Sequence, residues 1–294
     1  MQENLKTYID KYKQIISDKL SSSLHGLSIP GRLKESMVYS VEAGGKKLRP
    51  ILLIASFDAY GNDVNKAISA ALAVEMIHTY SLIHDDLPAM DNDDFRRGKP
   101  TNHKVFDEAT AILAGDALLT YSFELIATDT NLKPKQSVDL ITMLAKSSGP
   151  KGMVGGQILD MEAEQHPVTL KELEHIHTLK TGELLQFAIY AGAYLGDATE
   201  EQLEHLKEFA YYLGLIFQVQ DDILDVTGDP DILGKPVGSD EGNEKSTYPK
   251  LLGIDGAIEQ KKSYVQKAKD ALTKANAQSS ILMDLTDYFS HRDH

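Results

Sequence analysis

Residues 67–87, AISAALAVEMIHTYSLIHDDL, decide the fold of this 294-residue chain. The stretch is rich in alanine, isoleucine, leucine and methionine and has no internal glycine or proline, so it predicts a long, largely buried helix that ends near Pro88. Elsewhere the apolar residues recur at helical spacing, in segments well beyond the roughly 5 or 6 residues usual for strands. We therefore expect an all-α fold.

Two capping boxes mark the starts of further helices. Thr169 with Glu172 is the first, and it predicts a helix running towards Leu195. Thr199 with Gln202 is the second. Prolines lie between the helical segments, but no long Ser/Gly-rich stretch separates two units, so residues 1–294 are expected to form one domain of ten or more helices.

The chain is strongly acidic. It has 44 Asp plus Glu against 30 Lys plus Arg, a formal net charge of −14. Such a charge repels the phosphate backbone on which nucleic-acid affinity rests, so we expect no nucleic-acid partner. Any site for a smaller anion has to be built from local basic groups or from bridging metal ions.

The absence of cysteine excludes disulfides, thiolate catalysis and zinc sites of the cysteine type. The N-terminal residues 1–13 interleave Glu, Lys and Asp, and no apolar run approaches the ~20 residues that a membrane-spanning helix needs. These features predict a soluble, cytoplasmic protein with no membrane span.

An aspartate cluster follows the helix of residues 67–87. Its carboxylates are Asp85, Asp86 and Asp91, followed by two more at positions 93 and 94. Adjacent carboxylates at a helix C-terminus gain nothing locally, because the helix dipole disfavours anions there. Taken alone, the cluster is equally compatible with a solvated acidic loop.

A second aspartate cluster lies near the end of the predicted helix that Thr199 begins. Asp221 and Asp225 are four residues apart, so their carboxylates share one helical face and repel each other unless a cation lies between them; Asp222 lies next to Asp221. Mg²⁺ prefers oxygen ligands of this kind and is typically held by one or two carboxylates plus substrate phosphates. Two such clusters predict a magnesium-dependent phosphate site.

Basic residues accompany the aspartates. Arg96 and Arg97 follow the first cluster directly and can take phosphate oxygens bidentately. The segment 44–50, GGKKLRP, adds a glycine turn with three cations, although a helix-terminating loop with surface charge has the same pattern. Glycine in the predicted helix at Gly182, beside Lys180 and Thr181, suggests a close approach of backbone or ligand.

We assign no binding function to one other glycine-rich stretch. Residues 152–156 follow no predicted strand, so they do not form a dinucleotide-binding loop, and we interpret them as a site of close helix packing.

With these motifs in order, the sequence resembles the trans-type isoprenyl diphosphate synthases, and within them the bacterial farnesyl diphosphate synthases. The resemblance extends from about Leu33 to the C-terminus. It implies an isoprenoid-synthase-type helical bundle around a deep central cavity, a homodimer, and about three Mg²⁺ ions that clamp a diphosphate between the two motifs. It makes Asp85, Asp91 and Asp221 the surest metal ligands, with Asp86, Asp222 and Asp225 as direct or indirect partners.

The resemblance also implies substrates and their sites. The substrates are isopentenyl diphosphate with dimethylallyl or geranyl diphosphate. The residues matching the allylic site are Arg96, Lys180, Thr181, Gln218 and Lys235, and those matching the isopentenyl site are Lys46, Arg49, His78 and Arg97. Lys180, Thr181 and Gln218 are the catalytic candidates, and released diphosphate takes the final proton.

Tyr80 is the candidate for the floor of the product site. It lies five residues before Asp85, about 7.5 Å deeper along a straight helix. One isoprene unit extends by roughly 5 Å, so the floor allows a few units, and Ser81 beside it is the second chain-length candidate. An aromatic residue here with this first motif accompanies a C15 product in the family, which favours farnesyl over geranylgeranyl diphosphate; an ordinary core aromatic is the alternative for Tyr80.

Other functions fit less of the sequence. A His-Asp phosphohydrolase uses His84 and Asp85 but has no role for the Asp221 cluster. A terpene cyclase shares the first motif, but the second motif, Asp221 to Asp225, and the double arginine at Arg96 and Arg97 favour chain elongation. A non-catalytic partner subunit is expected to lose one aspartate motif, and both are intact here. Whether the C-terminal Arg292 folds over the site is a guess from its charge.

Overall fold

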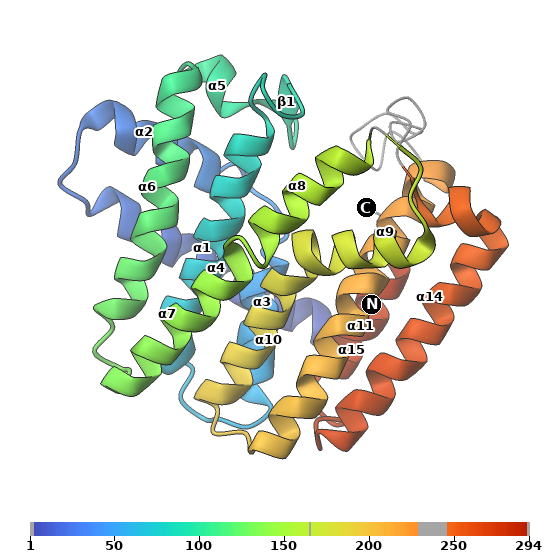
Figure 1. Cartoon of the computed structure of the whole chain (residues 1–294). Helices are drawn as coiled ribbons and strands as arrows, with labels where there is room; N and C mark the ends of the chain where they lie inside the picture. The colour runs from blue at the N-terminus through green and yellow to red at the C-terminus, as the bar shows by residue number, and fades with distance from the viewer. Residues whose placement is uncertain (1–2, 165, 229–245, 293–294) are drawn as a thin grey trace.

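A computed structural model describes residues 3–164, 166–228 and 246–292. It confirms the all-α class, since helices make up nearly all of the described chain (Figure 1). The predicted site residue Lys235 lies outside the described residues. The elements in chain order are α1 Glu3–His25, α2 Gly31–Val41, α3 Leu48–Asp58, α4 Asn65–Asp85, β1 Phe95–Arg96, β2 Lys99–Pro100, α5 Asn102–Val105, α6 Glu108–Ala127, α7 Pro134–Ser148, α8 Met153–Ala163, α9 Leu170–His177, the π-helical turn η1 Thr178–Gly182, α10 Glu183–Leu195, α11 Glu200–Thr227, α14 Tyr248–Lys274 and α15 Ile281–His291.

Helix α4 is the centre of the bundle. Every residue from Ala70 to Ile77 is buried, and the helix packs against α3, α6 and α10. The buried helix predicted from residues 67–87 is therefore confirmed, but it ends at Asp85, two residues early. The residue before Pro88 is biased away from the helical region, which explains the earlier end.

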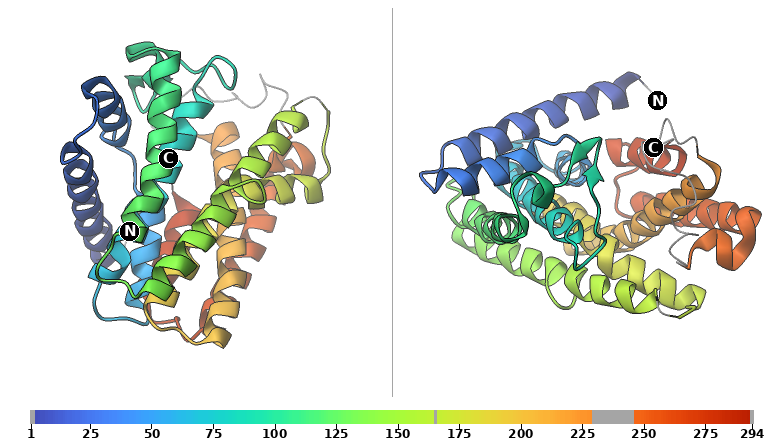
Figure 2. Two further views of the ribbon diagram at one scale, coloured as in Figure 1. Left: turned by 60° about the vertical axis from the view of Figure 1, so that its left-hand side comes forward. Right: turned by 90° about the horizontal axis from the view of Figure 1, so that it is seen from above.

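The remaining helices complete a bundle whose long members run side by side. Helix α10 packs on α3, and α11 packs along α14, with α15 against both of the latter (Figure 2). Helices α4 and α11 both run towards the same end of the bundle, where α4 finishes near the loop that carries β1 and α11 finishes beside the start of α14 (Figure 1). The fold thus brings the two aspartate motifs to one end of the molecule.

Both predicted capping boxes are present. The Thr169 hydroxyl accepts from the backbone N–H of Glu172 at 3.3 Å, and the Thr199 hydroxyl accepts from the backbone N–H of Gln202 at 3.2 Å. The helix that Thr169 begins does not continue as one regular α-helix to Leu195. It is interrupted by the π-helical turn η1, and such turns are frequent at functional sites.

The glycines mark close backbone packing, as the sequence predicted. A Cβ at Gly156 would lie 2.2 Å from the amide nitrogen of Lys180, so only glycine lets α8 approach η1 this closely. A Cβ at Gly214 of α11 would lie 3.1 Å from the Cα of Gly182. The backbone of α11 thus approaches Gly182 closely, although a Cβ at Gly182 itself would meet only ordinary contacts, the nearest at 3.5 Å.

A short hairpin is the departure from a purely helical chain. Strands β1 and β2 pair through Arg96 and Lys99, and the two residues between them, Arg97 and Gly98, have φ values of 53° and 73°. Two successive positive φ angles are the requirement of a type I′ hairpin turn. The hairpin holds Arg97 beside the first aspartate motif.

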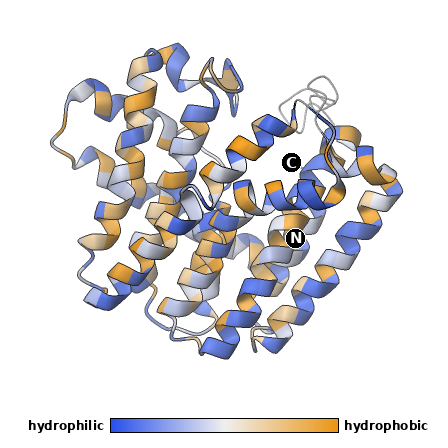
Figure 3. Cartoon of the chain, viewed as in Figure 1, coloured by the Kyte–Doolittle hydropathy of each residue, from blue (hydrophilic) through white to orange (hydrophobic). Residues whose placement is uncertain are grey.

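Helix α6 has an open apolar face. By length and composition it is the one helix in the described part of the chain that could cross a membrane, but a third of its apolar window is buried in the bundle and it packs along α4. Ile112 and Leu113 remain 43% and 59% exposed, and apolar colour runs along the helix in Figure 3. The sequence expectation of no membrane span stays a prediction.

Candidate active site

Asp85 is the last residue of α4 and lies in a crowded electrostatic environment. Burial raises its pKa to about 6, the ammonium of Lys180 opposes this shift, and the charges of Asp91 and Asp160 add to it. The backbone N–H of Asp91 donates to the carbonyl of Asp85 at 2.9 Å, so the loop folds back onto the helix end. The motif is therefore compact, with its carboxylates close enough to repel.

Asp86 points into a different environment. Its carboxylate accepts from the guanidinium of Arg96 at 2.6 Å, with the Asp86 side chain only 5% exposed. Burial raises the pKa of Asp86 to about 6 even though Arg96 opposes the shift. In this structure Asp86 orients Arg96, which suits an indirect role at a metal site better than direct ligation of a metal ion.

The aspartates of the second motif interact with other groups of the protein. Asp221 forms an ion pair with Arg292, and Asp222 accepts from the backbone N–H of Tyr248 at 2.8 Å. Asp225 is buried, with 2% of its surface exposed. Asp222 therefore anchors the start of α14 to α11, while Asp221 is held by a residue from the far end of the chain.

A cationic cluster surrounds His78. Burial, together with Arg49, Arg97, Lys47 and Arg96, holds the pKa of His78 well below its usual value. The imidazole is neutral at pH 7 and can donate one hydrogen bond without adding charge. In a chain of net charge −14, this concentration of cations is the local basic site that an anion requires.

The cations of the cluster are arranged by the glycine turn. Arg97 donates to the carbonyl of Gly44 at 2.6 Å, and a Cβ at Gly45 would collide with the Arg97 guanidinium at 2.5 Å. Burial lowers the pKa of Lys46 to about 8 and that of Arg49 to about 10. The GGKKLRP turn is therefore part of the site rather than a surface loop.

Arg49 carries an unsatisfied donor. Its Nε is buried and has no hydrogen-bond partner among the described residues. A buried donor in this state costs free energy unless a ligand or water accepts from it. The Arg49, His78 and Arg97 side chains are thus close together, in a form suited to an anion, whereas the charged neighbours of Lys46 are Asp221 and Arg292. The assignment of all four residues to one substrate site stays a prediction.

The catalytic candidates share one cavity. Lys180 and Thr181 of η1 and Gln218 of α11 line a cavity of about 190 Å³ together with Asp222 and Asp160. Lys180 donates to Asp160 at 2.6 Å. The structure brings the three predicted residues to one wall beside the second motif, while their chemical roles stay predictions.

Tyr80 lies where the sequence places it. Its ring is 6% exposed and packs edge-on against His84, with ring centroids 5.6 Å apart. Ser81 is half-buried and its hydroxyl donates to the carbonyl of His78 at 2.9 Å. Both residues are one to two turns below Asp85 on α4, and the chain-length role stays a prediction.

A family model described as polyprenyl synthetase matches residues 30–285. The chain belongs to this polyprenyl synthetase family. A farnesyl diphosphate synthase from Geobacillus stearothermophilus is 50% identical over 100% of this chain and 99% of its own length, and a geranylgeranyl diphosphate synthase from Cyanophora paradoxa is 43% identical over 99% and 97%. The apo crystal structure of an FPP/GFPP synthase from Zymomonas mobilis has a TM-score of 0.85 at 38% identity, over 97% of this chain and 100% of that one.

The donor set of this polyprenyl synthetase suits Mg²⁺. Carboxylate oxygens are the ligands that this ion prefers, and the mutual repulsion at Asp85 and Asp91 is what a cation between them relieves. Within the described ranges, no three His, Cys, Asp or Glu side chains are arranged to hold a metal by themselves.

Three polar residues at the site were missed by the sequence reasoning. Glu75 forms a buried ion pair with Lys47 at 3.1 Å, Asp160 pairs with Lys180, and His177 lines the cavity with its Nδ1 buried and unpartnered in the described structure. A signal existed for Glu75, since it is the one acid inside the apolar run that leads to His78. Asp160 and His177 could not be identified from the sequence, because the packing of α8 against η1 brings them to the cavity.

Proposed function

We propose that the chain condenses dimethylallyl or geranyl diphosphate with isopentenyl diphosphate, head to tail, to give farnesyl diphosphate. One observation carries this proposal: two aspartate motifs meet a cationic cluster and the Lys180 cavity at one end of the bundle. The 50% identity to a farnesyl diphosphate synthase over the full chain supports the same activity.

The allylic diphosphate is assigned to the side of the bundle with the aspartates and Lys180. Lys180 supplies positive charge to the departing diphosphate, and Arg96, oriented by Asp86, supplies more. The hydroxyl of Thr181 and the amide of Gln218 present oxygen dipoles that stabilise a developing allylic cation. Departure of the diphosphate is the difficult step, so these charges act where the barrier lies.

Isopentenyl diphosphate is assigned to the Lys46, Arg49, His78 and Arg97 cluster. The orphaned Nε of Arg49 and the neutral His78 are donors suited to its phosphate oxygens. Holding the second substrate beside the first converts a bimolecular encounter into an effectively unimolecular attack. The proton lost at the end passes to the released diphosphate.

We propose that about three Mg²⁺ ions serve this site. Asp85, Asp91 and Asp221 would hold them, with Asp86, Asp222 and Asp225 ordering the groups around them. When bound, the ions neutralise charge on the leaving diphosphate.

The C15 product rests on Tyr80 at the wall below Asp85. Its buried ring, backed edge-on by His84, limits the depth available to a growing chain. The 43% identity to a geranylgeranyl diphosphate synthase makes the C20 product the second candidate. A non-catalytic partner subunit is the remaining alternative.

We further propose a cytoplasmic homodimer that binds no nucleic acid. The exposed Ile112 and Leu113 on α6 support a second copy covering this face. Light scattering on the purified chain tests the dimer, and Leu113→Asp is expected to yield monomers.

Incubation of the purified chain with isopentenyl and dimethylallyl diphosphates, with and without Mg²⁺, tests the function. We expect a metal-dependent C15 product by mass spectrometry. A product of C20 or longer keeps the chemistry and discards the Tyr80 floor. In a parallel incubation with geranyl diphosphate alone, release of inorganic diphosphate with a cyclic hydrocarbon product indicates cyclisation. No condensation at all restores the partner-subunit alternative.

A further inference from the structure

Helix α8 contacts both ends of Lys180. Gly156 and Asp160 are four residues apart on α8 and therefore share one face. Gly156 brings α8 so close to η1 that a Cβ there would lie 2.2 Å from the Lys180 amide nitrogen and 2.7 Å from its Cα. Asp160, one turn further, accepts from the Lys180 ammonium at 2.6 Å.

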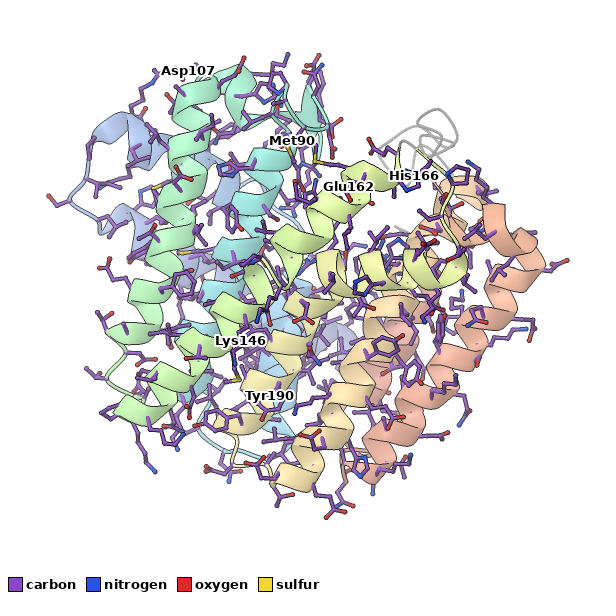
Figure 4. All side chains as sticks on the ribbon, viewed as in Figure 1. Met90, Asp107, Lys146, Glu162, His166 and Tyr190 are labelled. Carbon is purple, nitrogen blue, oxygen red and sulfur yellow. The ribbon has the colours of Figure 1, made fainter. Side chains whose placement is uncertain are left out.

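The pair is sheltered from water. The Lys180 and Asp160 side chains are 28% and 22% exposed, and both line the 190 Å³ cavity with Thr181 and Gln218. The end of α8, marked by Glu162 and the following His166, lies at the same end of the bundle as Met90 in the first aspartate loop (Figure 4). The pair thus belongs to the end of the molecule where the motifs meet.

Asp160 also acts on the first motif electrostatically. Its charge contributes to the raised pKa of Asp85, and the charge of Lys180 opposes it. Lys180 therefore stands within electrostatic reach of carboxylates on two sides, one from α8 and one from α4. Neither aspartate motif contains Asp160, and the family resemblance assigns it no role.

We propose that Asp160 is the positioning residue for Lys180. Lysine is a point charge on a flexible four-carbon stem, so its ammonium is placed only if a partner holds it. Gly156 fixes the backbone of Lys180 and Asp160 fixes its charge, which together set where the ammonium meets the leaving diphosphate. This inference rests on the proposed condensation, but its test includes a measurement that needs no turnover.

The first experiment compares Asp160→Asn with Asp139→Asn. Asp139 of α7 forms a lysine pair of the same 2.6 Å length with Lys135 and also accepts from the Tyr194 hydroxyl at 2.5 Å, so it controls for the loss of a lysine-binding carboxylate on another helix. We expect kcat to fall roughly tenfold or more in Asp160→Asn, with KM for isopentenyl diphosphate within about threefold and the melting temperature close to that of Asp139→Asn. Equal kcat values in the two variants would overturn the proposal.

A double-mutant cycle separates positioning from direct contact. If Asp160 acts through Lys180, adding Asp160→Asn to a Lys180→Gln background leaves kcat unchanged. A further loss of similar size in that background shows that Asp160 acts on the substrate by another route and overturns the assignment. Gly156→Ala, which displaces the Lys180 backbone, is expected to lower kcat in the same direction.

Calorimetric titration with inorganic diphosphate keeps the test independent of turnover. We expect Asp160→Asn to bind diphosphate several-fold more weakly than Asp139→Asn, and equal affinity counts against the proposal. If the wild-type chain binds diphosphate more tightly than Asp160→Asn but does not condense the substrates, the proposed function fails and the positioning role stands. Should Asp160→Asn not fold, Asp160→Glu takes its place. We expect its diphosphate affinity and kcat to lie between those of the wild type and those of a variant without the carboxylate, and wild-type values for both would contradict the proposal.

Discussion

The guanidinium of Arg292 forms an ion pair with the carboxylate of Asp221. Arg292 also donates to the carbonyl of Phe217 at 3.1 Å and lies over the Phe217 ring at 4.0 Å, so it is fixed on α11 rather than loosely placed. The sequence left the position of Arg292 as a guess. The structure places Arg292 directly on the second aspartate motif.

This pairing predicts competition between Arg292 and a metal ion. Arg292 is the counterion of Asp221 in the free chain. Arg292→Gln is therefore expected to lower the Mg²⁺ concentration for half-maximal activity about threefold, which corresponds to a binding free energy more favourable by ~0.6 kcal/mol. Diphosphate release measured across a Mg²⁺ series checks this. Arg32→Gln removes a surface pair with Asp107 and is the control. An unchanged or higher Mg²⁺ requirement would show that Arg292 supports the site instead.

Product length is expected to respond to Tyr80. Tyr80→Ala removes the buried ring that stands one turn below His84, so the growing chain gains depth and products longer than C15 should appear. Mass spectrometry of the products checks this. Tyr190→Ala, on α10 and away from the motifs, is the control (Figure 4). An unchanged product distribution in Tyr80→Ala would make Tyr80 an ordinary core residue.

The fold and the motifs were largely predictable because their signals are local. The apolar run of residues 67–87, the capping boxes and the paired aspartates each depend on a few consecutive residues. The π-helical turn at η1 was not predictable, since the pattern there is that of an ordinary helix and the packing of Gly156 against Lys180 decides the geometry.

The site was less predictable where it depends on pairs distant in sequence. Asp160 and Lys180 are 20 residues apart, and Arg292 lies 71 residues from Asp221. No local pattern links such residues, because their contact is a product of the bundle. The family resemblance ranked Asp86 and Asp222 below Asp85 and Asp221 as metal ligands, but it did not show that both hold protein groups, as they do in the structure.

Thr181 is expected to affect turnover rather than binding. Thr181→Val keeps the shape of a side chain that lines the cavity but removes its hydroxyl, so kcat should fall about tenfold with KM for the allylic diphosphate nearly unchanged. Thr181→Ser restores the hydroxyl and should recover most of the activity. Steady-state kinetics of the three chains decide the matter, and a rise in KM alone would assign Thr181 to binding.

Breaking the ion pair of Glu75 with Lys47 should be strongly destabilising. Both side chains are 3% exposed, so Glu75→Gln leaves a buried ammonium without its counterion and should cost about 3–5 kcal/mol of unfolding free energy. Glu204→Gln breaks an exposed pair with Lys207 and should cost at most about 1 kcal/mol. Chemical denaturation compares them. Similar costs in the two variants would mean that water reaches the Glu75 pair.

His177 makes stability depend on pH in the weakly acidic range. Burial lowers its pKa from 6.5 to about 4, so the unfolded chain takes up the proton first as pH falls. The stability due to the neutral ring is complete above pH 6.5 and is lost as pH falls towards 4. At pH 5.5 the loss from this residue is about 1.4 kcal/mol relative to pH 8.

The comparison of wild type with His177→Gln isolates that contribution. The variant has no imidazole at this position, so its unfolding free energy should fall less between pH 8 and pH 5.5, by about the same 1.4 kcal/mol. His175→Gln, two residues away on the exposed side of α9, should keep the full wild-type slope. Parallel slopes for wild type and His177→Gln would mean that burial does not lower the pKa of His177 in the folded chain.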